Sequence, residues 1–307
     1  MLVLIAGVTG SFGPHLIRSA LARNHQVRGV GRNPKSLPQD LRNKLESFVE
    51  IESYEDAAGL RRACHGVDAV ICALRPLAKI TLETQLCLLR HAEDAGIKVF
   101  VASTWNYDWT RLRFGDLAHY DPDIAFKRHV EMTSSIKPVY FLTGSFAEYT
   151  YSPLVFPVLD KGDGSGKNIE YWGEPDQMYD WTSMRDAAEF TFETLGQESV
   201  KQGEGGIFTF RSGQMSPRQI AAAYEKVHGV KVGLVCKGSV AELEEIALKA
   251  EREGNIQNYW TYLIYFVHLF TLKRIWTLQN PEECPQIKRT TLEEVAAFLP
   301  EANIGEK

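Results

Sequence analysis

Short apolar runs alternate with helix-like patterns along the first half of the chain. The apolar runs predict strands at Leu2–Ala6, Gln26–Val30, Ser47–Glu50, Ala69–Ala73, Lys98–Ala102 and Val139–Leu142. Helical spacing predicts helices near Gly13–Ala22, Ala57–Cys64, Leu82–Ala95 and Pro122–Ile136. Several strands are nearly continuous in Val, Ile and Leu, which indicates burial on both faces of a parallel sheet. The alternation therefore predicts an α/β fold of the Rossmann type, a doubly wound parallel sheet with helices on both faces.

The second half of the chain is less regular than the first. A turn-rich segment at 160–167 interrupts the alternation and predicts a boundary near residue 150, between regions 1–150 and 151–307. Beyond the boundary we expect strands at Ile169–Trp172 and Ile207–Phe210, and helices at Met184–Leu195, from Pro217 to about Val227, and after Thr290. The second region is thus expected to be smaller and mostly helical, and interleaved with the sheet.

Composition narrows the possible partners of the chain. A net charge of −5 and a pI near 6.0 show no basic excess, so we expect neither a nucleic acid nor a membrane partner. The five cysteines are scattered and odd in number, which favours reduced thiols in the cytoplasm. The eight histidines form no metal-binding spacing, so no metal is expected. A small-molecule substrate, and a monomer or homodimer, fit these features.

A glycine-rich loop follows the first predicted strand and opens the first predicted helix. Its residues are Gly7, Thr9, Gly10, Ser11, Phe12 and Gly13, with Val8 between the first two. Glycines at such a turn let the backbone approach a pyrophosphate, and the helix N-terminus supplies amide donors. The Gly-x-x-Gly-x-x-Gly spacing is shifted by one from the common dinucleotide fingerprint, and an ordinary strand–turn–helix remains the alternative. The βαβ context favours a dinucleotide site.

The end of the second predicted strand suggests which dinucleotide is bound. An NAD-selective site places an acidic residue there for the ribose hydroxyls, but this chain has Arg32 and Lys35 instead. Both offer positive charge to a 2′-phosphate, although surface cations are common in any protein. We therefore expect NADP(H) as cofactor, with 1–150 as the NADP-binding domain and 151–307 as the substrate-binding region.

Six segments match a known family in its order, across about half of the chain. They are Val3–Gly13, Val30–Pro34, Gly66–Ile71, Phe100–Ser103, Phe126–Glu131 and Leu142–Phe146, and Trp181–Ala188 and Met215–Ile220 look similar with less specificity. In these segments the chain resembles the NmrA-like, isoflavone-reductase-like branch of the atypical short-chain dehydrogenases. The resemblance implies an NADP-dependent oxidoreductase acting in specialised metabolism.

The resemblance also implies that Lys127 occupies the position of the lysine near the nicotinamide in reductase members. There it contacts the cofactor or takes part in proton transfer, whereas a solvated helix lysine is the alternative. Ordinary short-chain dehydrogenases use Tyr-x-x-x-Lys, but Asp123 stands four residues before Lys127. The tyrosine acid is absent, and Asp123 becomes the second catalytic candidate.

Further candidate residues lie where the central strands end, at the edge where open α/β sheets bind ligands. Ala73, Leu74 and Ser103 are expected to contact the cofactor. Five aromatic residues are expected to contact substrate, with loop anchoring as the alternative role: Trp105, Tyr107, Trp109, Phe146 and Tyr149.

Three functions compete at this point. The leading hypothesis is an NADPH-dependent reductase of a small aromatic or unsaturated compound, with hydride transfer from the nicotinamide. The missing tyrosine keeps open a second hypothesis, an NADP-binding regulatory sensor without turnover. The third is an enzyme that retains the NADP site but catalyses a non-redox cyclisation or isomerisation. The substrate itself is not encoded in any motif.

Overall fold

The computed structural model describes residues 1–152, 155–162, 164–255 and 258–297, which fall into two compact units. Unit 1 comprises Met1–Trp105, Leu112–Leu142 and Ala187–Thr209. Unit 2 comprises Asn106–Arg111, Thr143–Asp186 and the described residues from Phe210 onward. The chain thus enters unit 2 briefly at 106–111, passes to it again after residue 142, and returns to unit 1 at 187–209.

Unit 1 is built on one parallel sheet of seven strands. In chain order they are β1 (Leu2–Ala6), β2 (Gln26–Gly31), β3 (Ser47–Glu50), β4 (Ala69–Cys72), β5 (Val99–Val101), β6 (Val139–Leu142) and β11 (Gly206–Thr209). Their order in the sheet is β11-β6-β5-β4-β1-β2-β3, and every neighbouring pair is parallel. This doubly wound order reverses between β1 and β4, where such folds bind ligands. The predicted Rossmann-type fold is confirmed.

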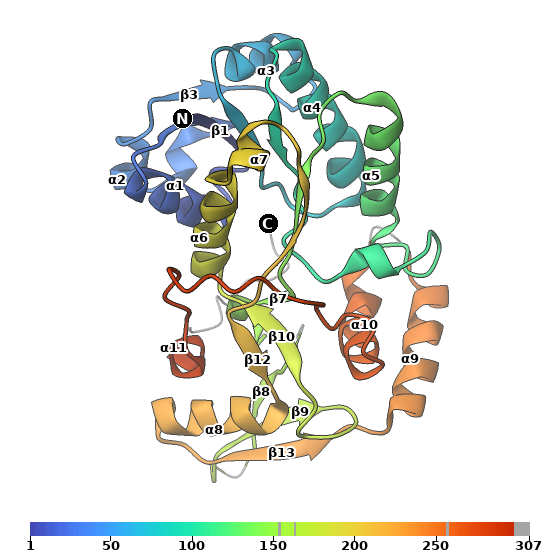
Figure 1. Cartoon of the computed structure of the whole chain (residues 1–307). Helices are drawn as coiled ribbons and strands as arrows, with labels where there is room; N and C mark the ends of the chain where they lie inside the picture. The colour runs from blue at the N-terminus through green and yellow to red at the C-terminus, as the bar shows by residue number, and fades with distance from the viewer. Residues whose placement is uncertain (153–154, 163, 256–257, 298–307) are drawn as a thin grey trace. The chain divides into compact units, whose positions relative to one another are not determined.

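Helices cover both faces of this sheet (Figure 1). They are α1 (Gly13–Ala22), α2 (Gln39–Arg42), α3 (Ala57–Cys64), α4 (Gln85–Asp94), α5 (Asp121–Thr133), α6 (Met184–Leu195) and α7 (Glu198–Lys201). In Figure 1, α4 and α5 lie on one side of the sheet, and α1 and α6 lie on the other. Helix α5 ends earlier than predicted because Ser134 adopts an extended backbone conformation. The two helical layers bury the β1 and β4 side chains, several of which have no exposed surface.

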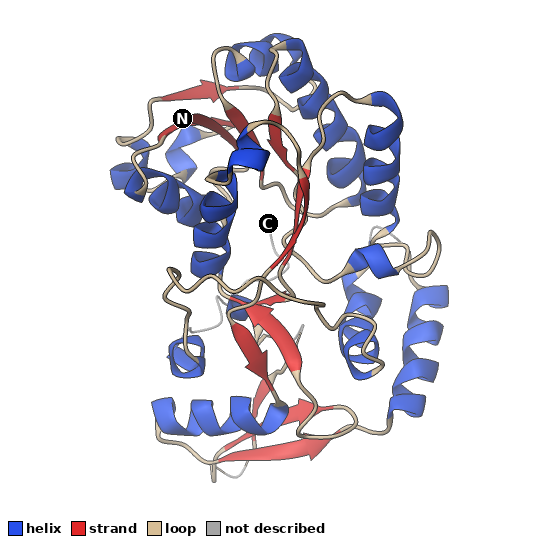
Figure 2. Cartoon of the chain, in the orientation of Figure 1, coloured by secondary structure: helices blue, strands red, loops and turns tan. Residues whose placement is uncertain are grey.

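Unit 2 combines two small sheets with helices (Figure 2). Strands β7 (Ser145–Phe146), β10 (Tyr179–Thr182) and β12 (Gly213–Met215) form one sheet, and β8 (Val158–Asp160), β9 (Lys167–Tyr171) and β13 (Val232–Cys236) form the other. The helices are α8 (Pro217–His228), α9 (Val240–Glu253), α10 (Trp260–Leu272) and α11 (Leu292–Ala297). A buried cluster that includes Phe156, Trp181, Met215 and Ile220 forms a core beneath them. The strands have two to five residues, too few for a periodic pattern to predict most of them.

In unit 2, capping residues mark the start of α8 and α11, close to the helix starts that the sequence predicts. Ser216 forms a capping box with Gln219 at the start of α8, and Gly229 ends that helix with a left-handed φ of 66°. Thr291 and Glu294 exchange the same pair of bonds at the start of α11. Of the helices in the described ranges, none is both long and apolar enough to cross a bilayer.

Candidate functional site

The glycine loop lies at the carboxyl end of β1, and two of its glycines have no room for a side chain. Gly7 has a φ of +87°, and a Cβ added there would lie 2.1 Å from the carbonyl oxygen of Ala73. A Cβ on Gly13 would lie 2.2 Å from the carbonyl oxygen of Val8. Both distances are far below van der Waals contact, so only glycine permits this close backbone turn.

The loop leads directly into α1, whose N-terminus is left open. Pro14 fits the first turn because its missing N–H would have no intrahelical partner. Within the described structure, no side chain caps α1 and its first turn contains no acidic residue. Gly10 and Ser11 are exposed beside it. A helix N-terminus with this exposure and dipole is suited to bind a phosphate group.

A hydrogen bond joins the segments that follow β4 and β5 beside the glycine loop. The Ser103 hydroxyl donates to the carbonyl oxygen of Leu74 at 2.8 Å, and the Ala73 N–H donates to the Ala6 oxygen at 2.8 Å. The Ser103 N–H donates to Oε1 of Gln85 at 2.7 Å, and the Gln85 side chain is buried. Ala73, Leu74 and Ser103 therefore meet at one edge with Gly7, as their positions at strand ends predict.

Arg32 lines a surface pocket of about 400 Å³ at the carboxyl ends of β2 and β3. The pocket is also lined by Arg62 and by the carboxylates of Glu50, Glu52 and Asp56. Two guanidinium groups therefore share the pocket with three carboxylates. Lys35 is exposed in a short 3-10 helix three residues beyond Arg32 and does not line the pocket. The structure thus places Arg32 and Lys35 in different surroundings.

Lys127 and Asp123 lie one helical turn apart on α5, but their surroundings differ. The Lys127 ammonium forms an ion pair with Glu131, and its side chain is partly exposed. Asp123 is buried, and burial raises the pKa of its carboxyl to about 8. At neutral pH the Asp123 carboxyl therefore keeps its proton, whereas the Lys127 ammonium is paired with Glu131.

The aromatic candidates occupy two kinds of environment. In unit 1, Trp105 is buried, its indole N–H donates to the Thr191 hydroxyl at 2.9 Å, and its ring packs edge-on against Phe12 at 4.9 Å. In unit 2, Tyr107 and Trp109 are buried and Tyr107 stacks on Trp276 at 4.3 Å. Phe146 and Tyr149, also in unit 2, are only partly buried and contact each other edge-on. These two are the more accessible rings of the set.

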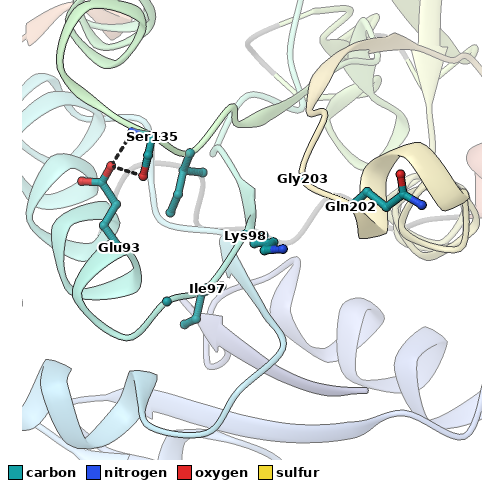
Figure 3. Close-up of a pocket in the computed structure, with 8 residues that line it drawn as sticks. Glu93, Ile97, Lys98, Ser135, Gln202 and Gly203 are labelled. Carbon is teal, nitrogen blue, oxygen red and sulfur yellow. Dashed lines mark hydrogen bonds between the residues drawn. The ribbon is translucent and has the colours of Figure 1, made fainter.

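A second surface pocket of unit 1 lies at the opposite edge of the same sheet (Figure 3). Its volume is about 330 Å³, and its lining residues precede β5, β6 and β11. Glu93 on α4 accepts bonds from the Ser135 N–H and hydroxyl there. Because the glycine loop follows β1 at the carboxyl edge, this pocket is separate from the candidate site.

Comparison with known proteins assigns the family. Residues 1–255 of the 307-residue chain match the profile of the NmrA-like family. The chain belongs to the NmrA-like family. The resemblance inferred from the six sequence segments is therefore confirmed.

Relatives of this NmrA-like chain include plant reductases. A bifunctional pinoresinol-lariciresinol reductase of Sinopodophyllum hexandrum is 25% identical over 267 residues, which cover 80% of this chain and 81% of the reductase. A leucoanthocyanidin reductase–NADPH complex from Vitis vinifera has a TM-score of 0.76 at 19% identity, covering 96% and 98% of the two chains. AtPrR2 with NADP+ and (+)-pinoresinol has a TM-score of 0.73 at 19% identity, covering 97% and 98%. At these identities the structural likeness concerns the fold.

Two residues of the site have no sequence signal that could have predicted them. Gln85 holds the backbone of Ser103, and Tyr54 contacts the N–H of Gly7 through its hydroxyl at 3.2 Å. Neither residue belongs to a motif, and each acts through a contact between segments far apart in the chain. Only the folded structure reveals such contacts.

Substituting Asp123 by asparagine is expected to remove part of the pH dependence of stability. In the unfolded chain this carboxyl has a pKa of about 4, whereas burial raises it to about 8 in the fold. Between these values the folded protein holds a proton that the unfolded chain has released, so the free energy of unfolding falls as the pH rises. From about pH 7 to about pH 8, the fall in wild type should exceed that in Asp123→Asn by about 1 kcal/mol.

Urea unfolding of both proteins across this range measures the difference directly. Burial raises the pKa of Glu148 to about 7 and lowers the pKa of His119 to about 4, but both groups are present in both proteins. Their contributions cancel in the comparison. Equal pH slopes would show that the Asp123 carboxyl is ionised in the folded protein.

Proposed function

We propose that this NmrA-like protein is an NADPH-dependent reductase of a small aromatic or unsaturated compound. The observation that carries the proposal is the loop between β1 and α1, where Gly7 and Gly13 have no room for a Cβ. The pinoresinol-lariciresinol reductase relative and the NADPH complex of leucoanthocyanidin reductase support the assignment of cofactor and reaction class.

The residues at the carboxyl edge of the sheet fit a dinucleotide. The backbone of the glycine loop and the open N-terminus of α1 would hold the pyrophosphate. Arg32 and Lys35 would bind the 2′-phosphate, and Arg62 adds a second guanidinium to the pocket that Arg32 lines. Ala73, Leu74 and Ser103 would line the path toward the nicotinamide. When bound, NADPH supplies the hydride for the reduction.

Proton transfer falls to residues of α5. The Lys127 ammonium donates a proton at Nζ to a substrate atom that gains negative charge, and Glu131 holds that ammonium through an ion pair. Asp123 keeps a neutral, buried carboxyl one turn away and is the second candidate for the acid that replaces the absent tyrosine. Holding the substrate and the nicotinamide in a reactive orientation accounts for the remaining rate enhancement.

Lys127→Met is expected to lower kcat by about 100-fold or more, because general acid catalysis contributes a factor of about 10² to 10⁴. The dissociation constant for NADPH should change by less than about threefold, since the phosphates are held by other residues. A control is Lys137→Met, which removes an exposed lysine paired with Glu204. Steady-state kinetics and NADPH titration of both variants make the test. An unchanged kcat in Lys127→Met would end the proposed role of Lys127.

A screen of conjugated and carbonyl compounds for NADPH consumption tests the reaction class. Consumption that depends on both substrate and protein supports the reductase. Tight NADPH binding without consumption across the screen would favour the regulatory sensor. A product formed without net NADPH consumption would favour the non-redox enzyme.

A further inference from the structure

The hydroxyl of Tyr54 lies between the carboxyl ends of β1 and β2. It accepts the N–H of Gly7 at 3.2 Å and donates to the carbonyl oxygen of Val30 at 3.3 Å. Gly7 is the first glycine of the loop, and Val30 lies two residues before Arg32. One side-chain hydroxyl therefore joins the two backbone segments that carry the proposed phosphate ligands.

The register of the two strands explains why a hydroxyl fits there. Ala6 pairs with Val30 in the parallel β1–β2 ladder, and the Gln26 N–H donates to the oxygen of Met1 at the start of the ladder. In a parallel ladder with this phase, the next bond beyond Ala6 would join the Gly7 N–H to the Val30 oxygen. The Tyr54 hydroxyl stands between those two atoms and satisfies both. A bridge through the hydroxyl thus takes the place of that backbone bond.

Tyr54 is itself held in place by the short connection between β3 and α3. The Ile51 N–H donates to the oxygen of Gly31 at 3.0 Å, and the Asp56 carboxylate accepts the Gly59 N–H at 2.9 Å as the cap of α3. The two ends of the 51–56 segment are thus fixed to the sheet and to a helix. Ile51, Glu52 and Asp56 of this segment also line the Arg32 pocket. Movement of Tyr54 is therefore coupled to the wall of that pocket.

We propose that Tyr54 is a positioning residue that sets the spacing between the glycine loop and Arg32, and thereby the selectivity for NADPH over NADH. The inference rests on the proposed NADP(H) site and deepens it. NADPH must contact both segments at once, through its pyrophosphate and its 2′-phosphate, whereas NADH has no 2′-phosphate to place. A fixed spacing removes the cost of ordering the two segments when NADPH binds. Burial raises the pKa of Tyr54, so the hydroxyl remains a donor and an acceptor at physiological pH.

Tyr54→Phe removes the bridging hydroxyl and keeps the ring. The Gly7 N–H and the Val30 oxygen then lose the hydroxyl that bridges them, and the loop is no longer held at a fixed spacing from Arg32. We expect NADPH to bind about three- to tenfold more weakly, the range for one lost hydrogen bond. NADH binding should weaken less, so the ratio of the two affinities should fall.

The matched control is Tyr151→Phe, which removes a buried hydroxyl that donates to the Ile220 oxygen at 3.1 Å in unit 2. Titration of wild type and both variants with NADPH and NADH, together with thermal unfolding, separates positioning from general destabilisation. Deuterium exchange of peptides covering 5–12 gives a readout without any ligand. Exchange there should be faster in Tyr54→Phe than in wild type or Tyr151→Phe.

The outcomes are distinct. A reduced NADPH-to-NADH affinity ratio with faster loop exchange in Tyr54→Phe, and neither change in Tyr151→Phe, supports the inference. Unchanged affinities, or equal losses for both dinucleotides, would overturn it while leaving the NADP(H) site intact. A wild-type protein that binds neither dinucleotide would overturn the proposed function and this inference together.

Discussion

Alanine at position 7 is expected to abolish measurable NADPH binding and to lower the free energy of unfolding by at least about 3 kcal/mol. Two effects combine at this residue. A left-handed φ of +87° strains any residue with a Cβ, and the added atom would lie 2.1 Å from the Ala73 carbonyl oxygen. Backbone on both sides must move apart, which disrupts the turn that holds the pyrophosphate. NADPH titration and urea unfolding of Gly7→Ala measure the two losses.

Gly66→Ala is the matched control for this substitution. Gly66 also has a left-handed φ, of +71°, but a Cβ there would meet no atom within 4 Å. The free energy of unfolding of Gly66→Ala should fall only by the cost of a left-handed backbone conformation in alanine, about 1 to 2 kcal/mol. The variant should still bind NADPH. If Gly7→Ala and Gly66→Ala lose equal stability and both bind NADPH, the close approach of Gly7 to Ala73 is not a constraint on the site.

Asp186→Ala is expected to lower the free energy of unfolding by about 3 to 5 kcal/mol, as for a broken buried ion pair. The Asp186 side chain has no exposed surface. Its carboxylate accepts bonds from the Ser212 hydroxyl at 2.6 Å, from the Thr290 N–H at 2.6 Å and hydroxyl at 3.0 Å, and from Arg185 Nε at 3.0 Å. Alanine leaves these donors without their acceptor and separates three distant segments of unit 2.

The comparison for Asp186→Ala is Asp176→Ala. Asp176 pairs with Arg218 at 2.8 Å, but both side chains are mostly exposed. Its loss should cost no more than about 1 kcal/mol, as for surface ion pairs in general. Chemical denaturation of the two variants ranks them. Similar losses would contradict the structural role that the bonds of Asp186 indicate.

Local sequence signals were sufficient for much of unit 1. The predicted bounds of α1 and α3 agree with the structure, because apolar periodicity and following loops mark their ends. The predicted helix Leu82–Ala95 differs, since a π-helical turn at Ile80–Thr84 precedes α4 and has no pattern of its own. Most short strands of unit 2 were not predicted for a related reason. Tertiary packing, rather than periodicity, stabilises such segments.

The same distinction between local signals and tertiary contacts applies to the residues of the candidate site. Gly7 and Gly13 could be predicted because backbone geometry demands glycine in a strand–loop–helix turn. Tyr54 and Asp186 could not, since a single tyrosine or aspartate in a chain carries no sign of its partners. Trp105 illustrates an ambiguity that composition leaves open. An aromatic residue at a strand end suits a substrate wall, but its ring here also packs against Phe12.

The most direct test of the account is the binding of NADPH and NADH to the purified protein. The account predicts that NADPH binds in the micromolar range or tighter and more tightly than NADH, because Arg32 and Lys35 stand where an NAD site has an acid. Isothermal titration of each dinucleotide gives both constants. Binding of neither dinucleotide, or preference for NADH, would contradict the central claim.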